Sequence, residues 1–535
     1  MKTKQLLLGW LAVGTGLALV SRRAFAGKAP ANPAGGGSSH EAVDAYVGQQ
    51  MRRLRIPGAA LAIIEGDRIV HLRGFGRARP DGEVPTPQTP FVLGSTTKSI
   101  TALAVMQLME AGSIELDAPV QRYLSWFRVA DPEASARMTV RHLLNQTSGL
   151  SMVAGMVNLA NLDDDPGAAE RQARALSTQV LARQVGIGFE YSNLNYNLLG
   201  LVVEAASREP YAAYVRRHIF EPLAMRHSYA SKAEAQRDNL AVGHRHWFGR
   251  PVPAPDLPLS HGSIASGQLI SCSEDMAHYL VTHLNGGRFD GHRILSEAGV
   301  AEMHRGEAEQ RVMGSLVASY GMGWFVNTVG GTKLISHGGN VPDFASFMGL
   351  LPEKRKGFVL LFNADPWGLP FVIAEVGEGA AAVLAGGPPP TIRLGFIPWV
   401  MRAQPLLPLL QIAGVLSTLR QLRRWRARPA FRTRRGVTAL KHLLLPLLPH
   451  LSLAALPVYL RSSGLLRYMD LYMPDFAWLA RISGGFAALW AIVRTGLVLR
   501  AMAPRPHRRL GGPPQPVSQQ RHVLPHRVWN GGDQP

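Results

Sequence analysis

The sequence predicts an exported domain of mixed α/β class followed by α-helical membrane segments, and three observations support this prediction. Two short runs rich in isoleucine, valine and leucine, residues 59–65 and 68–75, are separated by Gly66-Asp67, the pattern of a β-hairpin. Residues 96–109 then show apolar positions at helical spacing and end near Gly112, a favourable helix terminator. Towards the C-terminus the composition changes to three apolar stretches, each about long enough to cross a bilayer.

Composition and charge limit the classes of protein to which the chain can belong. Its 535 residues are 46% apolar and 18% charged, which is too apolar for a disordered protein. From residue 386 onward there are 21 lysines and arginines against 3 acidic residues, so most of the net charge of +20 lies there. The preceding part is nearly neutral, which excludes a basic nucleic-acid-binding globule. The single cysteine, Cys272, excludes a disulfide framework and a cysteine-based metal site.

The N-terminus has the pattern of an export signal. Two lysines precede an apolar run over residues 6–20, and Ala24-Phe25-Ala26 offers small residues where a signal peptidase cleaves. We therefore expect a signal peptide over residues 1–26. Arg22-Arg23 opposes export, which leaves an uncleaved anchor as the alternative. Residues 27–39, rich in alanine, proline, glycine and serine, are expected to form a flexible linker.

The three apolar stretches predict transmembrane helices at about residues 396–419, 437–460 and 482–499, after a linker over residues 386–395. Eight arginines separate the first two spans, and short loops with many positive charges face the cytoplasm. The segment before the third span is nearly balanced in charge, and the tail over residues 501–535 is basic again. With the preceding domain exported, the chain is expected to run out–in–out–in and to end in a disordered cytoplasmic tail.

The predicted spans are interrupted by residues that are uncommon in membrane helices. Prolines lie in the first two spans, and proline at membrane depth is tolerated when neighbours satisfy the freed carbonyls. Arg494 lies in the third, at a cost of about 2.5–3.5 kcal/mol unless it faces protein or reaches the interface. No acidic residue lies within the spans to pair with it. We therefore expect a simple anchor rather than an intramembrane site.

Ser95 and Lys98 lie at the start of the predicted helix over residues 96–109, one turn apart on the same side. A serine there has an unpaired backbone N–H and a helix dipole that favours developing negative charge. A lysine one turn further can hydrogen-bond the hydroxyl and help to remove its proton. Taken alone, the four residues favour a simpler interpretation, an N-cap serine followed by a surface lysine.

Two later segments change this interpretation. Tyr191 and Asn193 lie on a loop just before an apolar helix. His337-Gly338-Gly339 ends a predicted strand, and two glycines at a strand edge let another backbone approach closely. Residues 341–350 and 357–363 then have the pattern of paired strands.

Together these segments resemble the three motifs of the serine β-lactamase and penicillin-binding-protein superfamily, in its class C β-lactamase-like and D-alanyl-D-alanine carboxypeptidase-like branch. Ser95-Thr96-Thr97-Lys98 matches Ser-x-x-Lys, Tyr191-Ser192-Asn193 matches Tyr-x-Asn, and His337-Gly338-Gly339 is a His-x-Gly form of Lys-Thr-Gly. The resemblance covers about residues 40–380 and places the domain at residues 40–385. Three softer landmarks agree in order: residues 141–150, 265–271 and 320–324.

The resemblance implies a β-lactamase/transpeptidase-like fold. An antiparallel sheet of about five strands, formed by the hairpin near residue 60 and the strands after residue 320, would be flanked by helices on both faces. A mostly helical subdomain over roughly residues 113–260 would pack beside it. Ser95 and Tyr191 would then meet across the cleft between the two parts.

The resemblance also implies catalytic roles. Ser95 would be the nucleophile that forms an acyl-enzyme, and Lys98 and Tyr191 would share the work of the general base. A free tyrosine has a pKa of about 10, so it needs a nearby cation to ionise usefully, and Lys98 would supply one, with His337 as a hydrogen-bonding neighbour. No acidic residue can be assigned as a deacylation base. The water-activating step then falls to Tyr191 and Lys98, or is slow.

The resemblance assigns substrate binding to five residues: Asn193, His337, Gly338, Gly339 and Asn340. Asn193 would hold the amide of the acyl side chain, the glycines would let substrate lie along the strand edge, and the backbone N–H groups of Ser95 and Asn340 would form the oxyanion hole. His337 replaces the strand lysine and is a weaker partner for a substrate carboxylate, because histidine is only partly protonated near pH 7. That lowers the expectation of efficient β-lactam hydrolysis and leaves peptidase, amidase and esterase activity open.

The leading hypothesis is a serine hydrolase held in a bacterial inner (cytoplasmic) membrane, with its domain in the periplasm or cell exterior. It would act on D-Ala-type peptides, β-lactams or small esters, and the soluble domain should hydrolyse them alone. An alternative is a penicillin-binding receptor of the same fold that is acylated without turnover, although the arginine-rich loop is too short for an effector domain. A transport-type membrane protein is disfavoured because the spans carry no paired charges.

No cofactor, metal or nucleic-acid partner is expected, and the oligomeric state stays open. His244 and His246 could be a metal pair on a strand, but no third ligand lies nearby in the sequence. Residues 163–165, three aspartates, lack the alternating spacing of a calcium loop. Cys272 is expected to be a small buried apolar residue.

Overall fold

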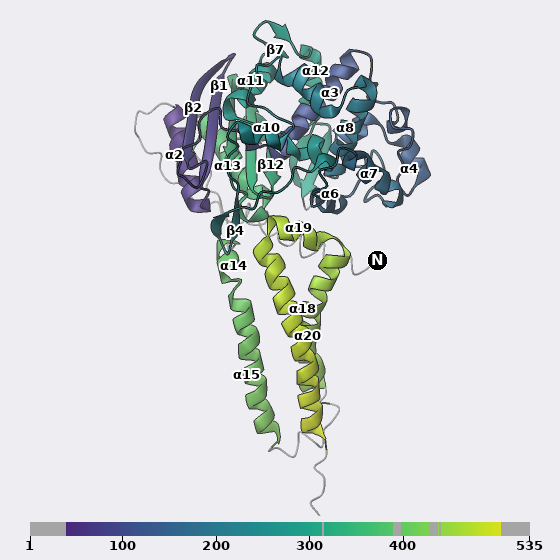
Figure 1. Cartoon of the computed structure of the whole chain (residues 1–535), viewed down its shortest axis with the longest axis vertical. Helices are drawn as coiled ribbons and strands as arrows, with labels where there is room; N and C mark the ends of the chain where they lie inside the picture. Colours follow the sequence, from purple (N-terminus) through teal and green to yellow (C-terminus); the bar gives the residue numbers. More distant parts are fainter. Residues whose placement is uncertain (1–38, 313–314, 389–396, 427–436, 438–439, 504–535) are drawn as a thin grey trace, which may run out of the picture.

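The computed structural model describes residues 39–312, 315–388, 397–426, 437 and 440–503. The predicted signal peptide, most of both predicted linkers and the tail from residue 504 lie outside these residues. Figure 1 shows a globular domain from which a bundle of long helices extends.

An antiparallel sheet is the centre of the globular domain. Within the described residues it has eight strands, all paired antiparallel to their neighbours. In spatial order they are β2 (Arg68–Gly76), β1 (Gly58–Glu65), β14 (Lys356–Phe362), β13 (Phe344–Leu351), β12 (Thr332–Val341), β11 (Phe325–Val329), β10 (Ser315–Tyr320) and β9 (Ala308–Val312). Three two-stranded pairs complete the strands: β3 (Phe91–Val92) with β6 (Ile270–Ser271), β4 (His244–Trp247) with β5 (Arg250–Pro253), and β7 (Arg288–Phe289) with β8 (His292–Arg293).

The expected number of about five strands in this sheet is too small. The hairpin β1–β2 and the later strands form as predicted, but β9 and β10 extend the sheet beyond them. β9 reads Ala-Glu-Gln-Arg-Val and lacks the apolar alternation that identifies a half-buried strand. An edge strand needs little apolar surface, so its sequence carries a weak signal.

Helices cover both faces of the sheet, as expected. One face packs on α2 and α13, whose apolar side chains share a core with strand residues such as Leu61 and Phe358. The other face packs on α11 and on a larger core that contains α3 and α8. The helices of the domain are α2 (Ser39–Leu54), α3 (Thr97–Glu110), α4 (Pro132–Arg137), α5 (Val140–Leu144), α6 (Met152–Leu159), α7 (Ala168–Arg174), α8 (Asn193–Ser207), α9 (Tyr211–Val215), α10 (Lys232–Arg237), α11 (Ser273–Leu284), α12 (Glu297–Met303) and α13 (Pro370–Leu384).

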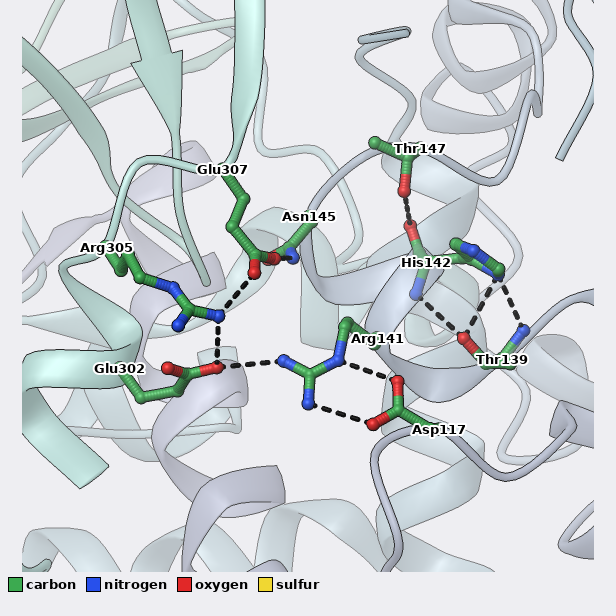
Figure 2. Close-up of polar contacts among 9 residues, drawn as sticks. All are labelled: Asp117, Thr139, Arg141, His142, Asn145, Thr147, Glu302, Arg305 and Glu307. Carbon is green, nitrogen blue, oxygen red and sulfur yellow. Dashed lines mark hydrogen bonds and ion pairs between the residues drawn. The ribbon is translucent and has the colours of Figure 1, made fainter. Parts of the chain in front are cut away.

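A polar network fastens the helical subdomain to the segment that leads into β9 (Figure 2). Arg141 on α5 forms ion pairs with Asp117 at 2.7 Å and with Glu302 on α12 at 2.8 Å. Glu307, just before β9, accepts hydrogen bonds from Asn145 and Arg305. The network therefore fixes the end of α5 against the sheet side of the molecule.

The C-terminal part forms helices over all three predicted spans. They are α15 (Leu406–Arg426), α18 (Leu445–Ser462) and α20 (Pro474–Met502), with α14 (Ile397–Ala403) before them and α19 (Leu465–Tyr472) between α18 and α20. Three spans were predicted, but among the described helices only α20 is long and apolar enough, by length and composition, to cross a membrane; α15 and α18 do not meet this test. Arg494 of α20 is 4% exposed and donates to the backbone oxygen of Leu443, so it faces protein. Four of the eight loop arginines expected between the first two spans lie on or at the end of α15.

Candidate active site

Ser95 lies in a single 3₁₀ turn, Gly94–Thr96, between β3 and α3. Its hydroxyl makes no capping bond to the helix, so the simpler N-cap interpretation does not hold. Gly94 has a φ of +60°, and a Cβ there would lie 2.6 Å from the backbone nitrogen of Asn340. A glycine is therefore required where the nucleophile turn packs on β12.

Lys98 is fully buried on the first turn of α3 and points at the serine. Its Nζ lies 3.0 Å from the Ser95 Oγ, 2.7 Å from the Asn193 Oδ1 and 2.6 Å from the backbone oxygen of Ser266. Burial holds the pKa of Lys98 well below its usual range. The amide and backbone oxygens can only accept, so in its neutral form the amine would donate its two N–H groups to them and turn its lone pair to Ser95.

Tyr191 lies on the loop that leads into α8, and Asn193 is the first residue of α8. The Gln146 side-chain oxygen accepts from the backbone N–H of Ser192 at 2.8 Å and from the Asn195 amide at 2.5 Å, which fixes this loop. The Tyr191 ring stacks on Phe325 with centroids 6.4 Å apart.

The electrostatics of Tyr191 differ from the expected ones. The Lys98 Nζ lies 5.1 Å from the centre of the Tyr191 ring. Burial nevertheless raises the pKa of Tyr191, and the hydrogen-bonded Ser95 hydroxyl offsets this only in part. The phenol therefore keeps its proton near pH 7.

β12 brings its glycines and Asn340 against the nucleophile turn. A Cβ on Gly339 would come within 2.0 Å of the backbone oxygen of Leu93 and 3.0 Å of the backbone nitrogen of Ser95, whereas one on Gly338 would make only ordinary contacts, the nearest at 3.7 Å. Gly339 is therefore needed for the packing of β12 on the turn, rather than to admit substrate. The Asn340 side-chain amide donates to Asp365 at 2.9 Å.

His337 is buried, and both of its ring nitrogens have partners. Nδ1 lies 2.7 Å from the backbone oxygen of Gly338, which can only accept, so Nδ1 carries the proton. Nε2 then accepts from the Tyr320 hydroxyl at 3.2 Å. Burial, with a smaller effect of Lys98, lowers the pKa of His337 to about 3. The ring is neutral at physiological pH and offers no cation to a substrate, and its hydrogen bonds do not reach Tyr191.

The structure thus brings Ser95, Lys98, Tyr191, Asn193, Gly339 and Asn340 together. The sequence did not reveal four supporting groups: the Ser266 carbonyl, Gln146, Tyr320 and Asp365. Ser266, Gln146 and Tyr320 lie within the three softer landmarks. The sequence showed that these landmarks occur in the order typical of the family, but it did not show what the three residues do. Asp365 follows β14 with no motif around it, and only the fold places it beside Asn340.

Residues that the sequence analysis considered and rejected as metal ligands have other partners in the structure. Asp163 and Asp165 form ion pairs with Arg171. Cys272 is fully buried, and its sulfur accepts from the Asp275 backbone N–H at the start of α11. Within the described part of the chain, no group of three or more histidine, cysteine or acidic side chains could hold a metal ion.

The fold and this arrangement of serine, lysine and tyrosine define a serine hydrolase of the β-lactamase and penicillin-binding-protein type. The family model described as Beta-lactamase matches residues 43–382. The chain belongs to that family.

Curated relatives are similar over the same part of the chain. Protein flp of Staphylococcus aureus (strain MW2) is 27% identical over 345 residues, which are 63% of this chain and 66% of that protein, so slightly less than two thirds of its length is matched. Penicillin-binding protein 4 of Amycolatopsis lactamdurans is 31% identical over 315 residues, which are 58% of this chain and 81% of that protein.

Solved structures show the same fold. The octameric penicillin-binding protein homologue from Pyrococcus abyssi has a TM-score of 0.58 and 28% identity, covering 66% of this chain and 78% of that one. The D-amino acid amidase from Ochrobactrum anthropi SV3 has a TM-score of 0.56 and 24% identity, covering 65% of this chain and 99% of that one, and is a likeness of fold alone.

Proposed function

We propose that this protein is a membrane-anchored, extracytoplasmic serine hydrolase that forms an acyl-enzyme on Ser95. One observation carries the proposal: the Nζ of a fully buried Lys98 lies 3.0 Å from the Ser95 Oγ, and its other two partners only accept hydrogen bonds. This arrangement favours an amine that can take the serine proton.

Acylation follows from this geometry. The Ser95 Oγ attacks the substrate carbonyl carbon while its proton passes to the Lys98 Nζ. The backbone N–H groups of Ser95 and Asn340 stabilise the oxyanion, a kind of contact whose loss typically costs ~10²–10³ in rate. The bond to the leaving amine or alcohol then breaks, and the leaving group takes a proton.

Tyr191 is best suited to deliver that proton. Its raised pKa keeps the phenol protonated, and it is hydrogen-bonded to the Ser95 hydroxyl. Lys98, now protonated, returns its proton to the phenolate that results. Water then attacks the acyl-enzyme by the reverse route, with Lys98 as base.

The proposed substrates are amide or ester acyl compounds: D-amino-acid peptides, β-lactams or small esters. The name of one relative, a penicillin-binding protein, supports this range. The neutral His337 favours substrates that do not depend on a cation at that position, which places esters and amides ahead of β-lactams.

The membrane and export parts of the proposal rest on different observations. α20 has the length and composition of a span, and large apolar side chains of α15 and α18 are exposed, among them Leu410 at 67% and Val458 at 68%. Such a surface fits a lipid environment. The export pattern at the N-terminus and the arginines after α15 support an orientation with the domain outside.

The test uses covalent labelling and turnover by the full-length protein in detergent. A fluorophosphonate should label the wild-type protein and not Ser95→Ala, while Ser125→Ala, which changes an exposed serine of the helical subdomain, should label normally. A chromogenic short-chain ester should then show steady turnover. Labelling of Ser95→Ala would refute the nucleophile. A single burst without turnover would favour the non-hydrolysing receptor instead.

A further inference from the structure

α19 lies at the end of the helical bundle that faces the globular domain (Figure 1). Its two tyrosines, Tyr468 and Tyr472, are 7% and 6% exposed, and their rings stack with centroids 4.2 Å apart. They share a small apolar cluster with Ala160 and Met156 of the domain. The segment between two predicted spans is therefore docked on the domain, which a simple anchor does not require.

The first route from α19 to the active site runs through α6. On one side of α6, a Cβ added to Gly464, just before α19, would lie 2.7 Å from Val157. On its other side, a Cβ added to Gly155 would lie 2.9 Å from the backbone nitrogen of Asn193 and 2.9 Å from the Ser192 Oγ. The Ser192 hydroxyl also donates to the backbone oxygen of Ser151 at 3.0 Å. α6 is thus a spacer, one helix thick, between α19 and the Tyr191–Asn193 loop.

The second route reaches the oxyanion hole. A Cβ on Gly368 would lie 2.6 Å from the backbone oxygen of Tyr472, so α19 abuts the segment that follows β14. That segment carries the buried Asp365, which accepts the hydrogen bond from the Asn340 side chain. Burial, followed by the charges of Tyr468 and Asp365, raises the pKa of Tyr472.

We infer that Tyr468 and Tyr472 are positioning residues of the active site, through which the membrane-anchoring part of the chain holds the Tyr191–Asn193 loop and Asn340 in their catalytic places. The inference rests on the proposed function, because it concerns the geometry of the same acyl-transfer site. α19 touches both supports at once, and a misplacement of about 1 Å at a reacting group can cost ~10²-fold in rate.

The test measures kcat and KM of the full-length protein in lipid nanodiscs, with active sites counted by a fluorophosphonate burst. Tyr468→Ala and Tyr472→Ala are expected to lower kcat per active site by ~10-fold or more. Tyr468→Phe and Tyr472→Phe keep the stacked rings and should restore most of kcat. Because the site and not general affinity is disturbed, KM should change much less than kcat.

Two control variants separate positioning from general loss of packing. Arg467→Ala changes an exposed residue of α19 itself. Leu422→Ala removes a side chain that is 4% exposed in a separate cluster of the helical bundle, formed with Leu443 and Val498. Both should keep kcat near that of the wild type, even where the melting temperature of Leu422→Ala falls as far as that of Tyr472→Ala.

The outcomes are distinct. Wild-type kcat per active site in folded Tyr468→Ala and Tyr472→Ala, or an equal loss in Leu422→Ala, overturns this inference and leaves the proposed function in place. Labelling that does not depend on Ser95 overturns the proposed function, and this inference with it.

Discussion

The buried amine of Lys98 is hydrogen-bonded to oxygens of Asn193 and Ser266. Its pKa determines how the rate of acylation should depend on pH. Burial lowers the pKa of the amine and raises that of Tyr191. A rate limited by serine deprotonation should therefore rise with pH as Lys98 loses its proton and level off well below 10.5, the ordinary lysine value.

The measurement is the rate of acylation by a neutral ester across pH. If Tyr191 were the base, the rise would instead occur at or above 10, its ordinary value, because burial raises the tyrosine pKa. Lys98→Met should reduce acylation by ~10²-fold or more on the high-pH plateau, where the wild-type amine is unprotonated, in line with the loss of a general base.

His337 makes the protein sensitive to acid. Its pKa is about 3 in the folded protein and 6.5 ordinarily, so the unfolded chain binds more protons between these values. The free energy of unfolding should fall as the pH drops from about 6.5 to about 3, by up to about 1.4 kcal/mol per pH unit for one proton. His337→Asn should flatten this dependence, as seen by the pH dependence of the unfolding midpoint. An unchanged slope would show that His337 is protonated in the folded protein.

Gly339 and Gly338 form a matched pair, since they are neighbours on β12 with different surroundings. Gly339→Ala would force a methyl group into the Leu93 carbonyl, so it should lower both the melting temperature and the labelling of Ser95. Gly338→Ala meets only ordinary contacts and should melt like the wild type. Equal melting of the two variants would contradict the close packing of β12 on the nucleophile turn.

The motif residues that the structure brings together could be predicted because they lie in short local motifs, but their environment could not. Lys98 was predicted to be a cation that helps Tyr191 to ionise. The structure instead lowers the pKa of Lys98 and raises that of Tyr191, because burial dominates and is set by distant elements such as α8 and the segment around Ser266. His337 was expected to be partly protonated near pH 7. The sequence could not show that it is neutral, because its burial is also set by distant elements.

At the scale of elements, the polar network of α5 connects the helical subdomain to α12 and to the segment before β9 (Figure 2). Arg141→Met would lose the ion pairs with Asp117 and Glu302. Because the arginine is partly exposed, the loss should be about 1 kcal/mol, equal to a fall of roughly 2 °C in melting temperature. Arg216→Met, which loses only an exposed pair with Glu221, should have no measurable effect. Differential scanning fluorimetry compares the two, and a loss as large in Arg216→Met would contradict a special role for the network.

Elements with strong periodicity were predictable, and polar ones were not. β1 is buried on both faces and reads as a continuous apolar run, and α3 follows its expected bounds closely. The sequence did not predict β9, β10 or the short helix α19. Whether these segments form a strand or a helix depends on the elements they pack against. α19 in particular lay in a segment read only as a loop between spans.

At the scale of the whole molecule, the orientation of the helices remains a prediction with a direct test. The chain has one cysteine, Cys272, which is fully buried. A single cysteine replacing Ser462, at the end of α18, should react with a membrane-impermeant maleimide added to intact cells. One replacing Arg424, at the end of α15, should react only after the cells are opened. The reverse pattern would refute the out–in–out–in order.

The docking of α19 also has a consequence for the order of synthesis. In the proposed topology, residues 39–388 would leave the ribosome and cross the membrane before residues 465–472 are made. A newly exported domain would then lack its last support until the α15–α18 hairpin has been inserted. Hydrolysis would reach its full rate only once α19 is in place, which ties full activity to the end of biogenesis.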